Sequence, residues 1–104
     1  MDVQFIDSHT RRFAEELRMP TSAKLFRTFE LLARFGNALG MPQSRHLGGG
    51  LFELRVRGVQ EVRFFYTFHR GRAILLHGFI KKSARIPQRE MDFARRKLSV
   101  LDEI

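Results

Sequence analysis

The apolar residues near the start of the chain recur at helical spacing after a short extended run. Residues 3–6 are β-like in composition, and Asp7 or Ser8 can cap a helix that follows them. Phe13 and Leu17, four residues apart, would then share the buried side of that helix. The pattern therefore predicts a strand followed by a first helix.

A second helix is predicted after Pro20, because proline interrupts the first one. It can begin at Thr21 or Ser22, and Gly36 is a suitable C-terminal stop. Its apolar stripe would consist of Leu25, Phe26, Phe29, Leu32 and Ala33. The glycine-rich residues 36–50 indicate a connecting loop.

Three short runs that follow the loop have the patterns of β-strands. They cover residues 51–57, 62–66 and 74–80, and a hairpin-like turn at residues 69–72 joins the second to the third. The third run is apolar on both faces, which is typical of a strand inside a sheet.

A last helix is expected after Pro87, which suits a first helical position. Its buried stripe would consist of Met91, Ala94, Leu98 and Leu101. The elements together predict an α+β fold, a small antiparallel sheet with two N-terminal helices and a C-terminal helix. The sequence contains no repeat or linker, so residues 1–104 are predicted to form a single domain.

Alternation within the first two predicted strands separates apolar from cationic side chains. One face is apolar, and the opposite face carries Arg55, Arg57 and Arg63. We expect the helices to pack on the apolar face and these arginines to point outward together. An open sheet face can also carry arginines only to prevent aggregation, so the pattern alone leaves both interpretations open.

The net charge of +8 is concentrated in the same region. Residues 45–89 contain ten Lys and Arg but only two acids, Glu53 and Glu61, whereas the remainder of the chain is balanced. A field of this kind favours a polyanionic partner, and RNA fits better than a membrane. Fifteen of the nineteen cations are Arg, which grips phosphate bidentately, although GC-rich coding would produce the same bias.

Composition excludes several classes of function. The absence of Cys excludes disulfides, thiolate catalysis and Cys-ligated metals, and it is consistent with a cytoplasmic protein. No apolar run is long enough to span a membrane, and the first residues do not resemble a secretory signal. The His and acidic residues lack metal-ligand spacing, so neither a metal nor another cofactor is expected.

Three motifs in the basic region carry a family resemblance. The string from Leu47 to Arg55, the Arg63-Phe-Phe-Tyr66 unit, and the string from Leu75 to Lys82 followed by Pro87 resemble the phage-derived branch of the RelE/HigB toxins, within the RelE/ParE superfamily. The resemblance implies a fold like that of microbial ribonucleases. It also implies metal-independent cleavage of mRNA on the ribosome, and neutralisation by an antitoxin that often has a helix-turn-helix domain.

The resemblance also suggests which residues act on RNA. Arg55, Arg63 and Lys82 match the family's catalytic cations, which would stabilise the anionic phosphorane of RNA cleavage. His46 is the histidine best placed for proton transfer. Arg57, Lys81 and Arg85 are expected to bind backbone phosphates. His77, inside an apolar strand, is interpreted as a hydrogen-bonded core residue.

The start of the last helix departs from the family pattern. Members of the superfamily often carry a Tyr or an acid there, and residues 83–90 contain no Tyr. Three functions therefore compete. The leading prediction is a toxin endoribonuclease that inhibits translation. The alternatives are a ParE-like toxin that poisons DNA gyrase and a degenerate toxin that binds RNA without cleaving it.

Overall fold

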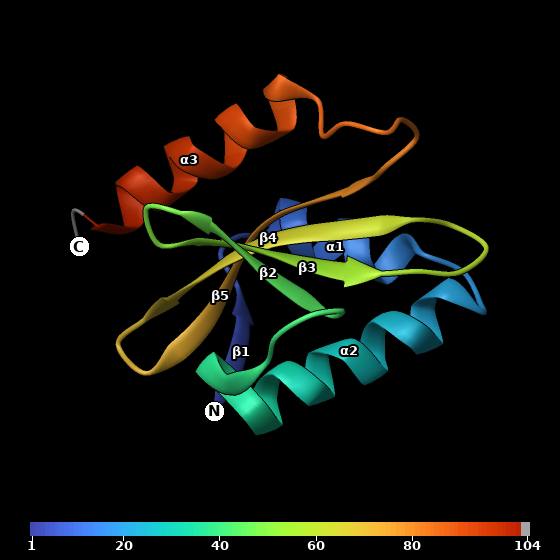
Figure 1. The fold of residues 1–104 in the computed structure, drawn as a ribbon, viewed down its shortest axis with the longest axis horizontal. Helices are drawn as coiled ribbons and strands as arrows, with labels where there is room; N and C mark the ends of the chain where they lie inside the picture. Colours follow the sequence, from blue (N-terminus) through green and yellow to red (C-terminus); the bar gives the residue numbers. More distant parts are fainter. Residues whose placement is uncertain (103–104) are drawn as a thin grey trace.

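The computed structural model describes residues 1–102. It consists of a five-stranded sheet with helices on both faces (Figure 1). The last two residues of the predicted domain lie outside the described part. The elements in chain order are β1 (Asp2–Phe5), α1 (Ser8–Glu16), α2 (Thr21–Phe35), the 3-10 helix η1 (Gly36–Ala38), β2 (Ser44–Gly48), β3 (Leu51–Val56), β4 (Val62–His69), β5 (Arg72–Ile80) and α3 (Gln88–Asp102). The predicted α+β class is confirmed.

The strand order of the sheet is β1-β5-β4-β3-β2. The sheet is mixed and not, as predicted, antiparallel throughout, because β1 pairs with β5 in parallel. The other neighbouring pairs are antiparallel. β5 lies inside the sheet, as its apolar composition predicted, and β4 is the central strand.

The loop predicted for residues 36–50 is partly wrong, because residues 44–48 form the edge strand β2. Gly48, Gly49 and Gly50 adopt positive φ angles of 96°, 61° and 81°. Glycine reaches this region without steric cost, so the chain reverses sharply here and β2 pairs with β3. The glycines belong to a tight hairpin rather than to a long loop.

The predicted cap of α1 and the predicted stop of α2 are confirmed. The Asp7 side chain accepts a hydrogen bond from the Thr10 amide at 2.8 Å and caps α1. At the end of α2, Gly36 has a φ of 53°. The final helix begins at Gln88, so Pro87 directly precedes it and is not, as predicted, its first residue.

Helices α1 and α2 cover one face of the sheet. Their core with β3, β4 and β5 contains Leu25, Leu32, Leu54, Val56, Val62, Phe64, Tyr66, Ala73 and Leu75. The prediction that Phe26 belongs to the buried stripe of α2 is wrong, because Phe26 is 70% exposed. It lies at the outer side of the stripe, where the sheet does not reach it.

Helix α3 packs on the opposite face, which contradicts the expectation that all helices share one side (Figure 1). Phe65 and Phe79 project to this face, and with Leu51, Ile74 and Leu76 they form a second core against Ala94, Leu98 and Leu101. The predicted buried stripe of α3 is therefore confirmed. The face was expected to be open because its arginines were weighed more heavily than its aromatic residues.

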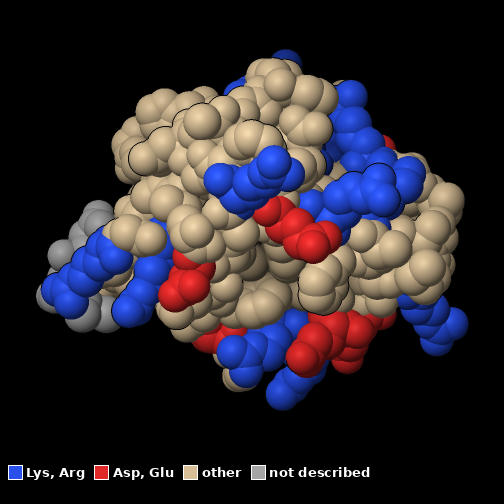
Figure 2. Space-filling view, turned by 90° about the horizontal axis from the view of Figure 1, so that it is seen from below, with Lys and Arg blue, Asp and Glu red and all other residues tan. Residues whose placement is uncertain are grey.

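Charges of both signs lie next to one another on the side of the molecule seen in Figure 2. This view looks at Figure 1 from below, toward α2. Within residues 1–102, no helix is long and apolar enough to cross a membrane.

Candidate nucleic-acid interface

The pairing of β3 with β4 brings two of the predicted catalytic cations together. Arg55 lies directly opposite Arg63, and Glu53 lies opposite Phe65 on the same face. On the other side of β3, Arg45 lies opposite Glu53. Because side chains directly opposite in a sheet share a face, three arginines surround one glutamate.

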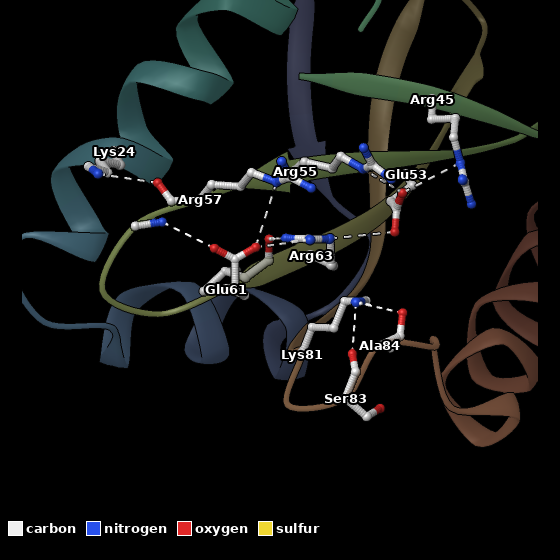
Figure 3. A network of polar contacts seen from close by, with 12 residues as sticks. Lys24, Arg45, Glu53, Arg55, Arg57, Glu61, Arg63, Lys81, Ser83 and Ala84 are labelled. Carbon is white, nitrogen blue, oxygen red and sulfur yellow. Dashed lines mark hydrogen bonds and ion pairs between the residues drawn. The ribbon is translucent and has the colours of Figure 1, made fainter. Parts of the chain in front are cut away.

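Glu53 is the centre of this cluster (Figure 3). Its side chain is 1% exposed, and its two oxygens lie 3.0 Å from Arg55 Nε, 3.6 Å from Arg63 Nε and 3.8 Å from Arg45 Nε. A buried carboxylate needs such partners, and three adjacent guanidinium groups need an anion between them. Glu53 thus allows the cations to lie side by side in the folded protein.

Arg63 is buried rather than turned outward, which corrects the sequence-based expectation. Its side chain is 3% exposed, and its Nη1 donates to the Val62 carbonyl at 3.1 Å. Its Nε has no hydrogen-bond partner, because the oxygen of Glu53 is 3.6 Å away. The expectation that Arg55, Arg57 and Arg63 would all point into solvent overlooked the two acids of the same region.

Glu61 covers the outer end of the Arg63 guanidinium (Figure 3). Its Oε1 lies 3.1 Å from Arg63 Nη2 and 3.7 Å from Arg57 Nε, and its Oε2 accepts the Gly58 amide at 3.4 Å. Burial opposes ionisation of this carboxyl group. The hydrogen bonds from Arg63 and Gly58 and the charges of both arginines outweigh that effect, so the pKa of Glu61 is lowered.

The segment between β5 and α3 brings further cations to the same end of the sheet. The Lys81 amide donates to the Glu61 carbonyl at 2.7 Å, so this segment starts beside Glu61. The Lys81 ammonium donates to the carbonyls of Ser83 and Ala84 at 2.8 and 3.0 Å. Lys82 and Arg85 are exposed. Lys81, which was predicted to bind RNA, is therefore held by its own loop.

His46 is separated from the cationic cluster. It lies on β2 opposite Phe52, whose ring centroid is 4.6 Å from the imidazole. Phe52 packs against the core under α1 and α2, whereas the neighbouring Arg45 faces Glu53 on the other side. Once residues 44–48 form a strand, alternation places His46 on the face opposite Arg55 and Arg63. The structure does not bring this predicted catalytic residue to the others.

The pairing of His77 with Glu90 was not foreseen. His77 is 8% exposed and buried, as the core interpretation predicted, and its Nε2 forms a short hydrogen bond with the Glu90 carboxylate. The imidazole lies against Phe93 of α3, with 5.4 Å between ring centroids. An acid in the first turn of the last helix, together with a histidine in the adjacent strand, was the available signal.

Two further carboxylates escaped the sequence reasoning, because Glu53 and Glu61 were considered only as minority charges. The spacing offered a signal, since Glu53 precedes Arg55 by two residues and Glu61 precedes Arg63 by two. Residues two apart on a strand share a face. Among residues 1–102, no group of three or more His, Asp or Glu side chains is arranged to hold a metal ion.

Comparison with known protein families places the chain in one of them. A family model described as phage derived protein Gp49-like (DUF891) matches residues 12–99. That range includes the cationic cluster, the segment between β5 and α3, and most of α3. Among curated proteins, no match to this chain is found.

Proposed function

Since this chain belongs to the phage-derived Gp49-like family (DUF891), we propose that it is the toxin of a toxin–antitoxin pair and cleaves mRNA on the ribosome. The family is of the RelE/HigB toxin-like type and is associated with such toxins. The observation that carries the proposal is the convergence of Arg55, Arg57, Arg63 and the Lys81 segment at one end of the sheet.

The proposed reaction needs no cofactor. The ribose 2′-oxygen loses its proton and attacks the adjacent phosphorus, and the bond from phosphorus to the 5′-oxygen breaks as that oxygen takes up a proton. The products are a 2′,3′-cyclic phosphate and a 5′-hydroxyl. Arg55 and Arg63 are the proposed partners of the extra negative charge in the phosphorane, where fixed cations are most effective.

Lys82 is the third proposed cation for the developing charge, and the other cations have more peripheral roles. Lys82 is exposed and follows the segment beside Glu61, so it can reach RNA bound at the end of the sheet. Arg57 and Arg85, which are also exposed, would bind backbone phosphates. Lys81 positions the segment through its bonds to Ser83 and Ala84. His46 is left out, because it lies on the other face.

The test is cleavage of a defined mRNA on translating ribosomes by the purified protein. We expect fragments with the two termini named above, and at least a tenfold loss of rate for Lys82→Gln, since one developing charge loses its cation. Arg12→Gln, an exposed residue of α1, makes the same change in net charge and should cleave normally. Intact message after incubation with the wild-type protein would refute the proposal.

A second candidate function is RNA binding without cleavage. The observation that favours it is the position of His46, which leaves the cationic cluster without the histidine expected for proton transfer. If the purified protein binds ribosome–mRNA complexes in a salt-sensitive way and leaves the mRNA uncut, this second function is supported.

We also propose an antitoxin partner that covers the cationic surface with an acidic segment. The other way to inactivate the site is to displace α3, but this would expose Ala94, Leu98 and Leu101 together with the aromatic residues under them. Exposing each large apolar side chain costs about 1.5–3 kcal/mol, so covering the surface is less costly. A complex with the antitoxin far from Arg55 and Arg63 would contradict direct coverage.

A further inference from the structure

Arg63 poses a problem for any anion that binds from solvent. Its side chain is 3% exposed, and its two terminal nitrogens donate to the Val62 carbonyl and to Glu61 Oε1. The Val62 bond lies on the buried side, whereas Glu61 is 40% exposed. Glu61 is therefore the group that separates Arg63 from solvent.

The donors around Glu61 match the requirements of a phosphodiester. One carboxylate oxygen lies 3.1 Å from Arg63 Nη2 and 3.7 Å from Arg57 Nε. The other accepts a hydrogen bond from the Gly58 amide at 3.4 Å. A phosphodiester likewise presents two charged oxygens to guanidinium groups and backbone amides. From this geometry we infer that Arg57, Arg63 and the Gly58 amide form a phosphate-binding subsite, which Glu61 fills in the structure and which an RNA phosphate takes over.

The two glutamates of the cluster differ in a way that makes only one of them exchangeable. Glu53 is 1% exposed and is enclosed by three arginines, so its departure would remove the buried counter-charge of Arg55 and Arg63. Glu61 has 40% of its side chain in solvent and can be hydrated after it leaves. Arg63 would keep its contacts with Glu53 and Val62, so the subsite would retain its shape.

The backbone of the turn is held independently of the Glu61 side chain. Lys24 of α2 donates to the Arg57 carbonyl at 3.2 Å (Figure 3). The Lys81 amide bonds to the Glu61 carbonyl at 2.7 Å. Both contacts use backbone groups, so the Glu61 side chain can rotate away while the Gly58 amide and Arg57 stay in place. The exchange requires a change of rotamer and no movement of the strands.

This subsite deepens the proposed function, on which its RNA ligand rests, and two probes test it. Inorganic tripolyphosphate measures anion binding alone, and a short 2′-O-methyl oligonucleotide measures RNA binding without cleavage. We expect Glu61→Gln to bind both about fivefold more tightly, because the competing carboxylate is gone. The slope of log affinity against log salt should steepen by about 0.7 for each phosphate gained on a single strand.

Glu30→Gln is the matched control. Glu30 is exposed on α2, and its substitution adds the same single unit to the net charge. It should leave both affinities near the wild-type value. Thermal melting verifies that each variant is folded, and Glu61→Ala provides a second substitution without a side-chain amide. Unchanged binding by folded Glu61→Gln, or an equal gain by Glu30→Gln, would overturn the inference.

The outcomes separate this inference from the proposed function. If the wild-type protein cleaves mRNA but Glu61→Gln gains no affinity for tripolyphosphate, the subsite is wrong and the ribonuclease proposal stands. If Glu61→Gln binds tripolyphosphate more tightly while the wild-type protein leaves mRNA intact, the subsite stands and the enzyme proposal fails.

Discussion

Three arginines lie within 3.8 Å of the Glu53 carboxylate, whose side chain is 1% exposed. At the scale of single residues, this arrangement makes Glu53 a determinant of stability. We expect Glu53→Leu to lower the free energy of unfolding by about 3 kcal/mol, because Arg63 would lose its buried counter-charge and keep only the partly exposed Glu61. Urea denaturation measures the change. Glu61→Gln, at a half-exposed position, should cost less than about 1 kcal/mol.

A double substitution distinguishes the unpaired charge from lost packing. Glu53→Leu combined with Arg63→Met removes both buried charges, and we expect it to recover at least half of the loss in unfolding free energy. A double variant no more stable than Glu53→Leu would show that the loss came from packing rather than from Arg63.

At the scale of elements, the start of α1 depends on Asp7. This residue caps the helix and also pairs with Lys97 of α3 at 3.0 Å. Burial opposes its ionisation, but the bonds from Thr10 and Lys97 outweigh burial and lower its pKa from 3.8 to about 2. A native pKa below the unfolded value means that ionised Asp7 stabilises the fold above pH 3.8, and that this stabilisation is lost as the pH falls toward 2.

Asp7→Ala should therefore destabilise the protein at neutral pH by about 1 kcal/mol, through loss of the cap and of the ion pair. For a chain of this size, the melting temperature would fall by about 4–8 °C. The difference from wild type should shrink between pH 4 and pH 2 in melting curves, as the Asp7 carboxyl of the wild type becomes protonated. Ser8→Ala, one residue further on, is the control. A difference that grows with acid would contradict the assignment.

Strand β5 requires a glycine where it crosses the aromatic core. A Cβ atom on Gly78 would lie 2.6 Å from Phe64 and 2.7 Å from Phe13. These rings make an edge-to-face contact at 5.6 Å, so neither can move without disturbing the other. We expect Gly78→Ala to cost about 1–3 kcal/mol in urea denaturation. Gly40→Ala, where a Cβ meets no atom within 4 Å, should be nearly neutral.

The helices and strands for which several local sequence signals pointed to the same element were predicted correctly. The caps, the proline breaks and the apolar spacing located α1, α2, α3 and the three long strands, because each depends on local chemistry. Strand β2 was missed, since its register depends on pairing with β3 through the glycine hairpin. The site was predicted as a cationic face, but which cations are buried depends on cross-strand neighbours such as Glu53 and Arg45. A linear charge pattern does not contain that information.

At the scale of the whole molecule, the sheet separates two cores, and α3 closes the second one beside the cationic cluster. The underside of α3 holds the hydrogen bond between His77 and Glu90. The His77 ring also stacks near Phe65 and Phe79, with centroids 6.5 and 6.0 Å away. Because its surroundings are aromatic, we assign this pair to the attachment of α3 and not to the chemistry on RNA.

If the pair attaches α3, Glu90→Ala should loosen this helix. The variant leaves His77 without its acceptor under α3, which should reduce stability by about 1.5–3 kcal/mol. Hydrogen exchange should show faster exchange in α3, while the amides of β3 and β4 keep their protection. Glu15→Ala, at an exposed position of α1, should change neither the stability nor the hydrogen exchange of α3. If cleavage of ribosome-bound mRNA falls tenfold in folded Glu90→Ala with α3 protection unchanged, then the pair takes part in catalysis and the structural assignment is wrong.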